Sequence, residues 1–546
     1  MIKTSSSPAY LSLGLHCFAL ALLMVALLVP NRIDALGISS FYFFPVEILV
    51  LSLLLLLRGR VGLILRWIMA GFLALGIIFK CADMATFNVF ARPFNPVFDG
   101  YLFANGMNLL NGAIGKVGAL VVAALLILLV LSITLAAFWV LGRVQHLLRK
   151  AEQRAPLVLL AGFFVGAAFW FTLFFSGSPK ASMQFYLHLS NHARAVVATL
   201  ADLETFNAQL DKSEKFVDQY CALFSRLQGK NVLVIFVESY GRTVLDNPEF
   251  SPHVRPLLEQ VSTELEAQGF AMRSGFLTSP TVGGLSWLAH GTALSGVWID
   301  NQITYNSLMM SKQPTLNRLF NQAGWRTVAV MPAITMDWPE GNYYGYDHIY
   351  HSRNLGYQGK PFNWVTMPDQ YTLSAFHKRE LAEKSSTPVM AEIALISSHA
   401  PWTPIPELID WNAVGDGAAF NAQATSGDSP EAVWKNNARI RLQFRLSIEY
   451  ALQTIASYIV NYGDDDLVVL VLGDHQPAPI VTGETDRTKP GSMDVPIHLI
   501  ARDPEVIRAI ENWRWTPGMV PATDAPVWRM DKLRNQFIEA FSLPNN

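Results

Sequence analysis

Apolar positions divide the chain into two parts of different character. Before about residue 177 the sequence is a series of long apolar stretches, and after it apolar and polar positions mix as in a water-soluble globular protein. Five of the stretches approach the ~20 residues that a helix needs to cross a bilayer. They are Leu11–Pro30, Phe41–Leu57, Val61–Ile78, Val117–Val140 and Leu157–Phe175. We therefore expect a five-helix transmembrane domain over residues 1–176.

The first apolar stretch has a second interpretation, as a cleaved signal peptide. It follows a short head that contains Lys3, as a signal sequence would. However, it is long for a signal sequence, lacks a convincing small-residue cleavage site, and is followed by further apolar stretches. We interpret it as the first transmembrane helix.

Basic residues between the expected helices predict their orientation. Lys and Arg accumulate in cytoplasmic connections, and two connections here, between helices two and three and between helices four and five, are basic. Their basic residues are Arg58, Arg60, Arg143, Arg149, Lys150 and Arg154. With five crossings the N-terminus is then inside, and everything after Phe175 lies outside the cytoplasmic membrane.

Composition and charge exclude several classes of function. Hydrophobic residues make up 51% of the 546 positions and charged residues only 15%, a balance typical of membrane proteins. The formal net charge of −2 and the lack of a Lys/Arg block argue against nucleic acid as a partner. Cys17, Cys81 and Cys221 are far apart, so they predict neither a disulfide framework nor a cysteine metal site.

After residue 176 the pattern predicts a helical linker over residues 177–229 and an α/β domain over residues 230–546. Continuous apolar, β-branched runs alternate with helical patterns, which is typical of α/β folds with a mostly parallel central sheet. The expected strands are Asn231–Val237, Thr327–Met331, Val389–Ile396, Leu467–Leu472 and Val495–Ile500.

Polar side chains directly follow these strands. Glu238 follows the first, His399 lies just after the third, and the Asp474-His475 pair follows the fourth, while Ser286 opens a helical pattern behind two glycines. Because the carboxyl ends of parallel strands meet at one edge of a sheet, we expect these groups to share a site.

Each of these residues also has an ordinary structural explanation. Ser286 could be a helix N-cap, Glu238 or Asp474 could cap a helix or turn, and His399 could be a hydrogen-bonded loop histidine. Together, Glu238, Ser286, Asp474 and His475 offer the oxygen and nitrogen ligands of one divalent ion, Mn²⁺, Zn²⁺ or Mg²⁺. Such an ion would lower the pKa of the Ser286 hydroxyl and make it a nucleophile.

Four motifs resemble those of a known superfamily. They are Val237-Glu-Ser-Tyr240, Gly283-Gly-Leu-Ser-Trp287, Ser397-Ser-His-Ala-Pro401 and Leu472-Gly-Asp-His-Gln-Pro477. They look like the sulfatase-like branch of the alkaline phosphatase superfamily, and the apolar helices before them look like its lipoteichoic-acid-synthase and phosphoethanolamine-transferase members. The resemblance implies that Glu238, Ser286, Asp474 and His475 bind the metal. It makes Ser286 the nucleophile as well, and gives His399 contact with the phosphate or protonation of the leaving oxygen.

The same resemblance implies a headgroup pocket. Its expected residues are Trp338, Asp347, Arg353, Trp364 and Asp369. Arg353 is the natural phosphate partner, because guanidinium binds phosphate through two parallel hydrogen bonds. The alternative is a Tyr/Trp-rich loop packed on the domain. His290, one turn after Ser286, either reaches the site or packs its helix.

Two departures from the family pattern narrow the chemistry. The nucleophile is serine where these transferases more often have threonine, and both are hydroxyls. No cysteine lies near residue 286 to become the formylglycine of true sulfatases, which argues against sulfate-ester hydrolysis. The disulfides common in lipid A phosphoethanolamine transferases cannot form either, which favours phosphoglycerol transfer modestly.

We therefore expect a multi-pass enzyme of the bacterial inner membrane with its catalytic domain on the periplasmic or extracellular side. It would move a phosphoglycerol or phosphoethanolamine headgroup from phosphatidylglycerol or phosphatidylethanolamine, through a covalent Ser286 intermediate, to an envelope glycan or glycolipid. The alternatives are a phosphate mono- or diester hydrolase and an inactive glycan-assembly module.

Overall fold

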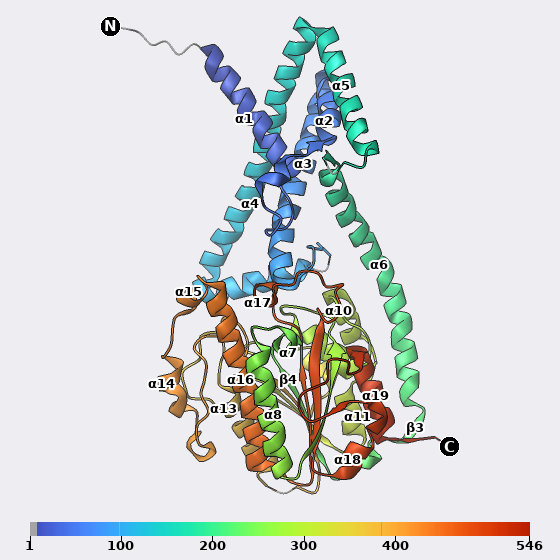
Figure 1. Ribbon diagram of the computed structural model, residues 1–546, viewed down its shortest axis with the longest axis vertical. Helices are drawn as coiled ribbons and strands as arrows, with labels where there is room; N and C mark the ends of the chain where they lie inside the picture. Colours follow the sequence, from blue (N-terminus) through green and yellow to red (C-terminus); the bar gives the residue numbers. More distant parts are fainter. Residues whose placement is uncertain (1–7, 98, 179, 384, 546) are drawn as a thin grey trace. The chain divides into compact units, whose positions relative to one another are not determined.

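The computed structural model describes residues 8–97, 99–178, 180–383 and 385–545, and its elements are traced in Figure 1. The chain splits into two compact units. The first consists of residues 1–87 and 92–201, and the second of residues 88–91 and 202–546.

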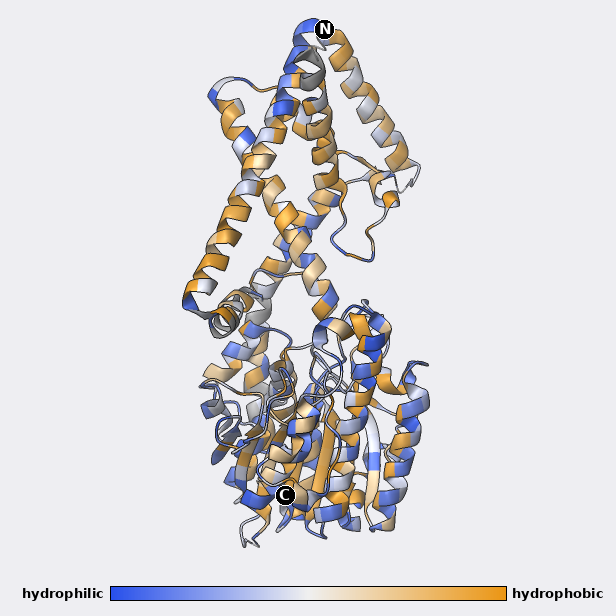
Figure 2. Cartoon of the chain, turned by 90° about the vertical axis from the view of Figure 1, so that its left-hand side faces the viewer, coloured by the Kyte–Doolittle hydropathy of each residue, from blue (hydrophilic) through white to orange (hydrophobic). Residues whose placement is uncertain are grey.

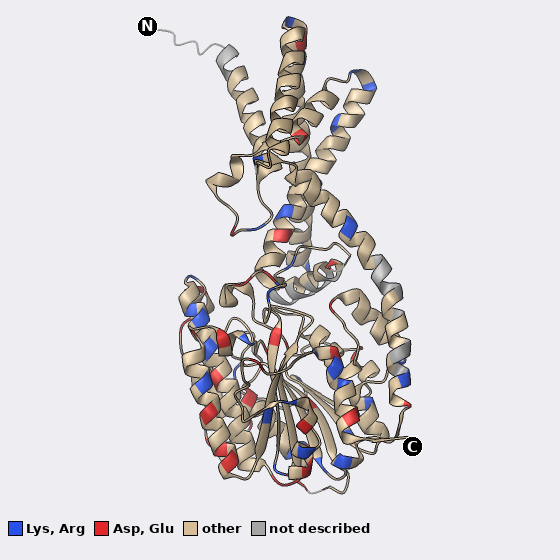
Figure 3. Ribbon diagram, turned by 45° about the vertical axis from the view of Figure 1, so that its right-hand side comes forward, with Lys and Arg blue, Asp and Glu red and all other residues tan. Residues whose placement is uncertain are grey.

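The first unit is helical. Its helices are α1 (Pro8–Leu28), α2 (Glu47–Leu55), α3 (Gly59–Phe90), α4 (Gly100–Arg154), α5 (Pro156–Phe175) and the start of α6 (Gln184–Val217). Most residues of these helices are hydrophobic in Figure 2, and few of them are charged in Figure 3. Side chains of α1, α3 and α4, among them Leu23, Leu73 and Leu141, form a core of this unit.

Three helices among the described residues are long and apolar enough to cross a membrane. They cover Gly59–Phe90, Ile114–Arg154 and Pro156–Phe175, and Ser12–Leu28 is a shorter apolar helix. Gly115, with φ of +75°, separates the apolar part of α4 from a short preceding helix.

The expected second span is not confirmed. Within Phe41–Leu57 only the 9 residues of α2 are helical, which is roughly 13 Å and far less than a bilayer needs. The stretch contains Pro45, which ends the two-residue strand β1 (Phe44–Pro45), and β1 pairs with β2 (Ala181–Ser182). Apolar composition alone could not reveal that this stretch contains a two-residue strand and only a short α-helix.

The two basic connections lie at the same end of the first unit. Arg58 forms an ion pair with Glu152 at 3.0 Å, and Arg149 donates a hydrogen bond to the Leu57 carbonyl at 3.0 Å. The predicted orientation requires this proximity, since both connections must be cytoplasmic. Which side of the membrane they occupy stays a prediction.

The second unit is built on a nine-stranded sheet. Its strand order is β11-β5-β10-β9-β4-β8-β6-β7, and β12 also pairs with β5. The strands are β4 (Asn231–Val237), β5 (Ala271–Thr278), β6 (Arg326–Met331), β7 (His348–His351), β8 (Val389–Leu395), β9 (Leu467–Gly473), β10 (Asp494–Ala501), β11 (Thr516–Pro517) and β12 (Val527–Arg529).

The sheet is mixed, so the expectation of a mostly parallel sheet is wrong. β4 runs parallel to β8 and β9, and β6 runs parallel to β7 and β8, but β10 runs antiparallel to both β9 and β5. An apolar run such as β10 carries no signal of its direction. β5, which contains Arg273, Ser274 and Gly275, lacks the apolar run that would have predicted it.

Helices cover both faces of this sheet. In Figure 1, α8 (Ser251–Ala267), α13 (Asp369–Phe376) and α16 (Asn437–Tyr462) lie on one side, and α11 (Leu316–Gln322) and α19 (Leu533–Phe541) on the other. The central strand β4 is buried on both faces, which explains why six consecutive apolar residues follow Asn231.

The predicted orientation can be tested with a single cysteine. Cys221 is exposed on the second unit, and we expect it to lie outside the cytoplasmic membrane. In a Cys17→Ser, Cys81→Ser background, a membrane-impermeant maleimide should label Cys221 in intact bacterial spheroplasts.

The matched control places a cysteine in a basic connection. Gln153→Cys, at an exposed position in a chain without other cysteines, should react only after lysis. Labelling of Gln153→Cys in intact spheroplasts, with Cys221 protected until lysis, would show that the orientation is the reverse of the predicted one.

Candidate active site

Two carboxylates meet at the carboxyl edge of the parallel strands. Glu238 directly follows β4 and Asp474 directly follows β9, and the last residues of these strands, Val237 and Gly473, are register partners. The next residue of each strand is therefore carried to the same place. Parallel pairing thus brings these two predicted residues together, with His475 one residue further on.

Ser286 is the first residue of helix α9 (Ser286–Ser295). The three residues before it have positive φ: +74° at Gly283, +145° at Gly284 and +66° at Leu285. This left-handed turn suits glycine and strains Leu285. It brings Ser286 Oγ within 3.0 Å of Glu238 Oε2 and 3.2 Å of His475 Nε2.

The Ser286 hydroxyl does not cap its helix. The N-cap position belongs to Leu285, whose side chain makes no capping hydrogen bond. Ser286 instead donates to Glu238. The ordinary explanation of this serine as an N-cap is therefore wrong, and its hydroxyl faces the carboxylates and the imidazole.

Glu238, Asp474 and His475 fit a divalent ion. Their ligand atoms lie within 4.8 Å of one another, with His475 Nε2 at 3.2 Å from Glu238 Oε1 and 3.6 Å from Asp474 Oδ2. Two ligands of a tetrahedral ion with bonds of about 2.0–2.1 Å lie about 3.3 Å apart. With the Ser286 hydroxyl included, the site offers three oxygen ligands and one imidazole nitrogen, a set that suits Zn²⁺ or Mn²⁺.

Hydrogen bonds orient each of these donors. The backbone N–H groups of Ser239 and His475 donate to Asp474 Oδ1 at 2.8 and 2.7 Å, and the Ser239 hydroxyl donates to Glu238 Oε1 at 3.0 Å. His475 Nδ1 donates to the Gln476 carbonyl at 2.9 Å, which leaves Nε2 as the ligand nitrogen.

Burial and mutual charge interactions shift the pKa values of all three side chains in the cluster. Burial would lower the pKa of His475, but Asp474 and Glu238 outweigh it and raise that pKa to about 9. Burial and the neighbouring Glu238 raise the pKa of Asp474 to about 6. Burial opposes ionisation of Glu238, yet His475 keeps the pKa of this carboxyl well below its usual range. The buried Asp474 and the partly buried Glu238 thus favour a protonated His475 imidazole.

His399 lies in the turn after β8 and stacks on Trp364. Their ring centroids are 5.0 Å apart at 9°, and Trp364 is 56% exposed. His399 Nδ1 donates to the Ala400 carbonyl at 2.6 Å, so Nε2 is the nitrogen that can exchange a proton. The structure places this predicted pair together.

Asp369 supports that turn from within the protein. It is fully buried, and its Oδ1 accepts from the backbone N–H groups of Ile396 at 2.9 Å and Ser397 at 3.0 Å. Burial raises its pKa to about 6. The buried Asp369 carboxylate thus holds the turn that carries His399, and substrate binding by Asp369 stays a prediction.

Asp347 lies at the opposite edge of the sheet. It precedes β7 and accepts from the backbone N–H of Thr327, near the start of β6, at 2.8 Å, and from the Asn321 amide at 2.8 Å. The amino ends of parallel strands face away from the site. The structure therefore does not bring Asp347 to the other predicted site residues, because strand β7 interrupts the expected loop.

Arg353 and Trp338 remain on the carboxyl side of β7. Arg353 follows that strand and pairs with Asp337 at 3.0 Å, where the two side chains are 56% and 97% exposed. So exposed a pair contributes little, and a phosphate could displace it at small cost. Trp338 packs on Tyr344 and Tyr346, with centroids 5.7 and 6.4 Å away, as in the alternative of a packed aromatic loop.

His290 is held by a glutamate that the sequence interpretation missed. Its ring stacks on Phe236 at 3.8 Å, and Nδ1 lies 2.7 Å from Glu392 Oε1. Tyr346 donates to the other Glu392 oxygen. Glu392 is 1% exposed on β8, and the signal for it was one acidic residue inside the apolar run Val389–Leu395. His290 therefore supports α9.

A hydroxyl, two carboxylates and an imidazole thus gather at the carboxyl edge of the parallel strands in a mixed α/β sheet. The family model that matches the chain is that of the sulfatases, over residues 230–514. This chain belongs to the sulfatase family, and a search of curated proteins gave no match.

Solved structures show distant similarity. Lipoteichoic acid synthase LtaP from Listeria monocytogenes is 13% identical, with a TM-score of 0.36, over 59% of this chain and 74% of that one. The periplasmic domain of phosphoethanolamine transferase EptC from Campylobacter jejuni is 12% identical, with a TM-score of 0.37, over 56% and 87%. Phosphoglycerol transferase GacH from Streptococcus pyogenes is 12% identical, with a TM-score of 0.36, over 62% and 91%.

Metal affinity at this site should depend on pH. An ion must displace the proton of His475, whose pKa is raised to about 9, so affinity should fall about tenfold for each unit that the pH drops from 9 to 7. Calorimetry at pH 7.5 in two buffers should show about one proton released per ion. Metal binding that is lost in His475→Ala is assigned to this site. If the affinity of that binding did not depend on pH, the assignment would be contradicted.

Proposed function

We propose that this chain is a membrane-anchored transferase that moves a phospholipid headgroup, phosphoglycerol or phosphoethanolamine, to an envelope glycan or glycolipid. One observation carries the proposal. The Ser286 hydroxyl does not cap its helix and instead contacts Glu238 and His475, which is the arrangement of an activated nucleophile.

In the first half-reaction Ser286 Oγ attacks the phosphorus of the lipid headgroup. The Oγ–P bond forms, the bond from phosphorus to the diacylglycerol oxygen breaks, and the Ser286 proton passes by way of Glu238, its hydrogen-bond partner, to solvent. His399 gives the proton that the leaving diacylglycerol oxygen requires. A divalent ion bound by Glu238, Ser286, Asp474 and His475 would lower the pKa of the hydroxyl and offset phosphoryl charge.

In the second half-reaction an acceptor hydroxyl attacks the same phosphorus. His399, now neutral, takes the proton of that hydroxyl, and Ser286 Oγ leaves and recovers its proton. The Trp364 ring stacked on His399 holds the imidazole in one orientation during both proton transfers. Since Trp364 is exposed, it also offers a flat surface to an incoming sugar ring.

Arg353 is the residue best suited to the headgroup phosphate. Its guanidinium exchanges the exposed Asp337 carboxylate for phosphoryl oxygens, where two parallel hydrogen bonds fix the phosphate. The three long apolar helices support a lipid donor, because an enzyme held in the bilayer works at a high effective concentration of lipid.

The test is release of diacylglycerol by the full-length protein in lipid nanodiscs that contain labelled phosphatidylglycerol or phosphatidylethanolamine. Ser286→Ala should lower the rate by at least about a thousandfold, because it removes the hydroxyl that forms the phosphoester. Ser286→Thr, which keeps a hydroxyl, should retain most of the activity and serves as the matched control.

The fate of the label separates the candidate reactions. Label on added envelope glycan supports transfer, and label released as free headgroup phosphate supports a hydrolase. An unchanged rate in Ser286→Ala, with intact folding by circular dichroism, would contradict the mechanism in either form.

A further inference from the structure

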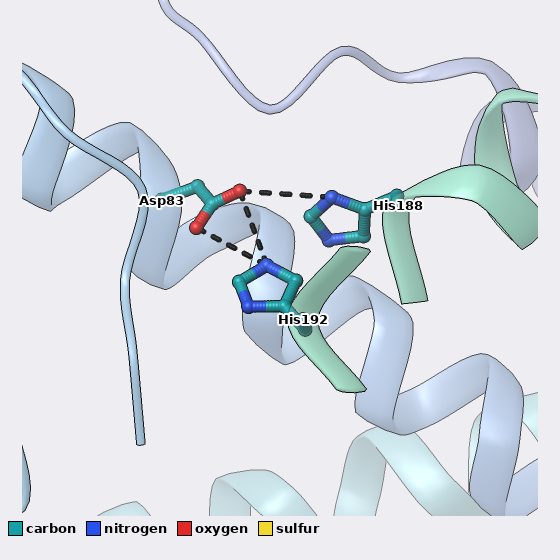
Figure 4. A group of neighbouring side chains, drawn as sticks. All are labelled: Asp83, His188 and His192. Atoms are coloured by element: carbon teal, nitrogen blue, oxygen red, sulfur yellow. Dashed lines mark hydrogen bonds and ion pairs between the residues drawn. The ribbon is translucent and has the colours of Figure 1, made fainter. Parts of the chain in front are cut away.

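The first unit contains its own group of metal-ligating side chains. Asp83 on α3 faces His188 and His192 on α6, as Figure 4 shows, and their ligand atoms lie within 4.8 Å of one another. The two histidines are four residues apart, so they project from one face of the helix. This spacing lets one helix supply two imidazoles to the same ion.

The distances in this group suit a shared ion better than direct hydrogen bonds. His192 Nε2 lies 3.3 Å from each Asp83 oxygen, and His188 Nδ1 lies 3.6 Å from Oδ2. Charge-assisted N–H···O bonds are shorter, about 2.7–2.9 Å. Two ligands of a tetrahedral zinc ion, with bonds of about 2.0–2.1 Å, lie about 3.3 Å apart.

Burial makes the group costly without a further partner. Asp83 is fully buried, His192 is 5% exposed, and the His188 side chain is 8% exposed. His188 Nε2 is also buried without a hydrogen-bond partner among the described residues. A carboxylate removed from water needs a compensating positive charge as well as hydrogen bonds, and two imidazoles at 3.3–3.6 Å bring a charge only when they are protonated.

A cationic side chain on the same helix is used elsewhere. Lys80 lies one turn before Asp83 on α3, but its Nζ donates to the carbonyls of Ala26 and Leu27 at 3.1 and 3.0 Å. These carbonyls belong to the C-terminal end of α1, where a positive charge is favourable. Lys80 therefore completes α1 and does not contact the Asp83 carboxylate.

Other hydrogen bonds fix the carboxylate in the way that ligand carboxylates are fixed. Asn31 Nδ2 donates to Asp83 Oδ2 at 2.7 Å, and the backbone N–H of Phe94 donates to Oδ1 at 2.8 Å. Each oxygen keeps a further lone pair for a ligand. The carboxylate is thus held towards the two histidines by groups outside the cluster.

We propose that Asp83, His188 and His192 bind a zinc ion, with a water molecule in the fourth position. Two imidazoles and one carboxylate form a ligand set that borderline metals such as Zn²⁺ accept. The ion ties α3 to α6, and through Asn31 it also restrains the segment that follows α1. It is a structural site, made of different residues from those at the carboxyl edge of the sheet.

The test counts zinc in a chain whose other site has been removed. Full-length protein without a histidine tag carries His475→Ala and Asp474→Asn, is purified in detergent, stripped with a chelator, reloaded with Zn²⁺ and desalted. Mass spectrometry of the metal should find one zinc per chain. Adding His188→Ala and His192→Ala should remove it, and adding His253→Ala, an exposed histidine of α8, should not.

Two outcomes overturn the proposal. One is no zinc in the His475→Ala, Asp474→Asn chain, in which case Asp83 and the histidines form a metal-free polar cluster. The other is zinc that persists after both histidines are replaced. Because the count is made without the active-site ligands, its result does not depend on the proposed transferase activity.

Two further measurements apply if the double histidine variant fails to fold. X-ray absorption of the zinc-loaded His475→Ala, Asp474→Asn chain should show two histidine nitrogens at about 2.0–2.1 Å, and a shell without histidine overturns the assignment. Asn31→Ala, which removes only the hydrogen bond to Asp83, should weaken zinc affinity about 10–100-fold, and an unchanged affinity contradicts the proposed support of the carboxylate.

Discussion

The second unit depends on the placement of two carboxylates, Glu238 and Asp474, beside each other in its interior. Adjacent parallel strands deliver them there, and burial makes two like charges at this spacing unfavourable unless a cation lies between them. His475 supplies that cation as a protonated imidazole, and a divalent ion would supply it when bound. The Ser286 hydroxyl points towards Glu238 for the same reason, because its hydrogen bond stabilises the negative charge of that carboxylate.

The surrounding backbone is shaped to meet this demand. Ser239 and Leu285 have φ of +59° and +66°, a region that costs non-glycine residues about 1–3 kcal/mol each. The strained Ser239 returns two hydrogen bonds to the carboxylates, and the strained Leu285 turns the chain so that Ser286 begins α9 beside them. Such strain persists because the buried sheet and helices around it over-determine the backbone.

The sequence predicted the residues whose position follows from the order of the strands. It did not predict the direction of a strand, the length of a helix or the contacts of a loop residue. All five expected strands exist. Glu238, Asp474 and His475 lie together because the ends of the neighbouring parallel strands β4 and β9 coincide, and the turn before α9 brings Ser286 to them. The antiparallel direction of β10 and the shortness of α2 leave no mark in an apolar run. Asp347 precedes β7 and Asp369 supports a buried turn, where the sequence had predicted a pocket loop, and Glu392 was missed because it lies inside its strand.

The central claim is that Ser286 shares one ion with Glu238, Asp474 and His475. Anomalous diffraction at the zinc edge from crystals of the zinc-loaded protein tests it most directly. The account predicts a peak among these side chains, with Ser286 Oγ within about 2.2 Å of the ion. A peak elsewhere, or a peak at these three ligands with Ser286 Oγ beyond bonding distance and turned away, would contradict it.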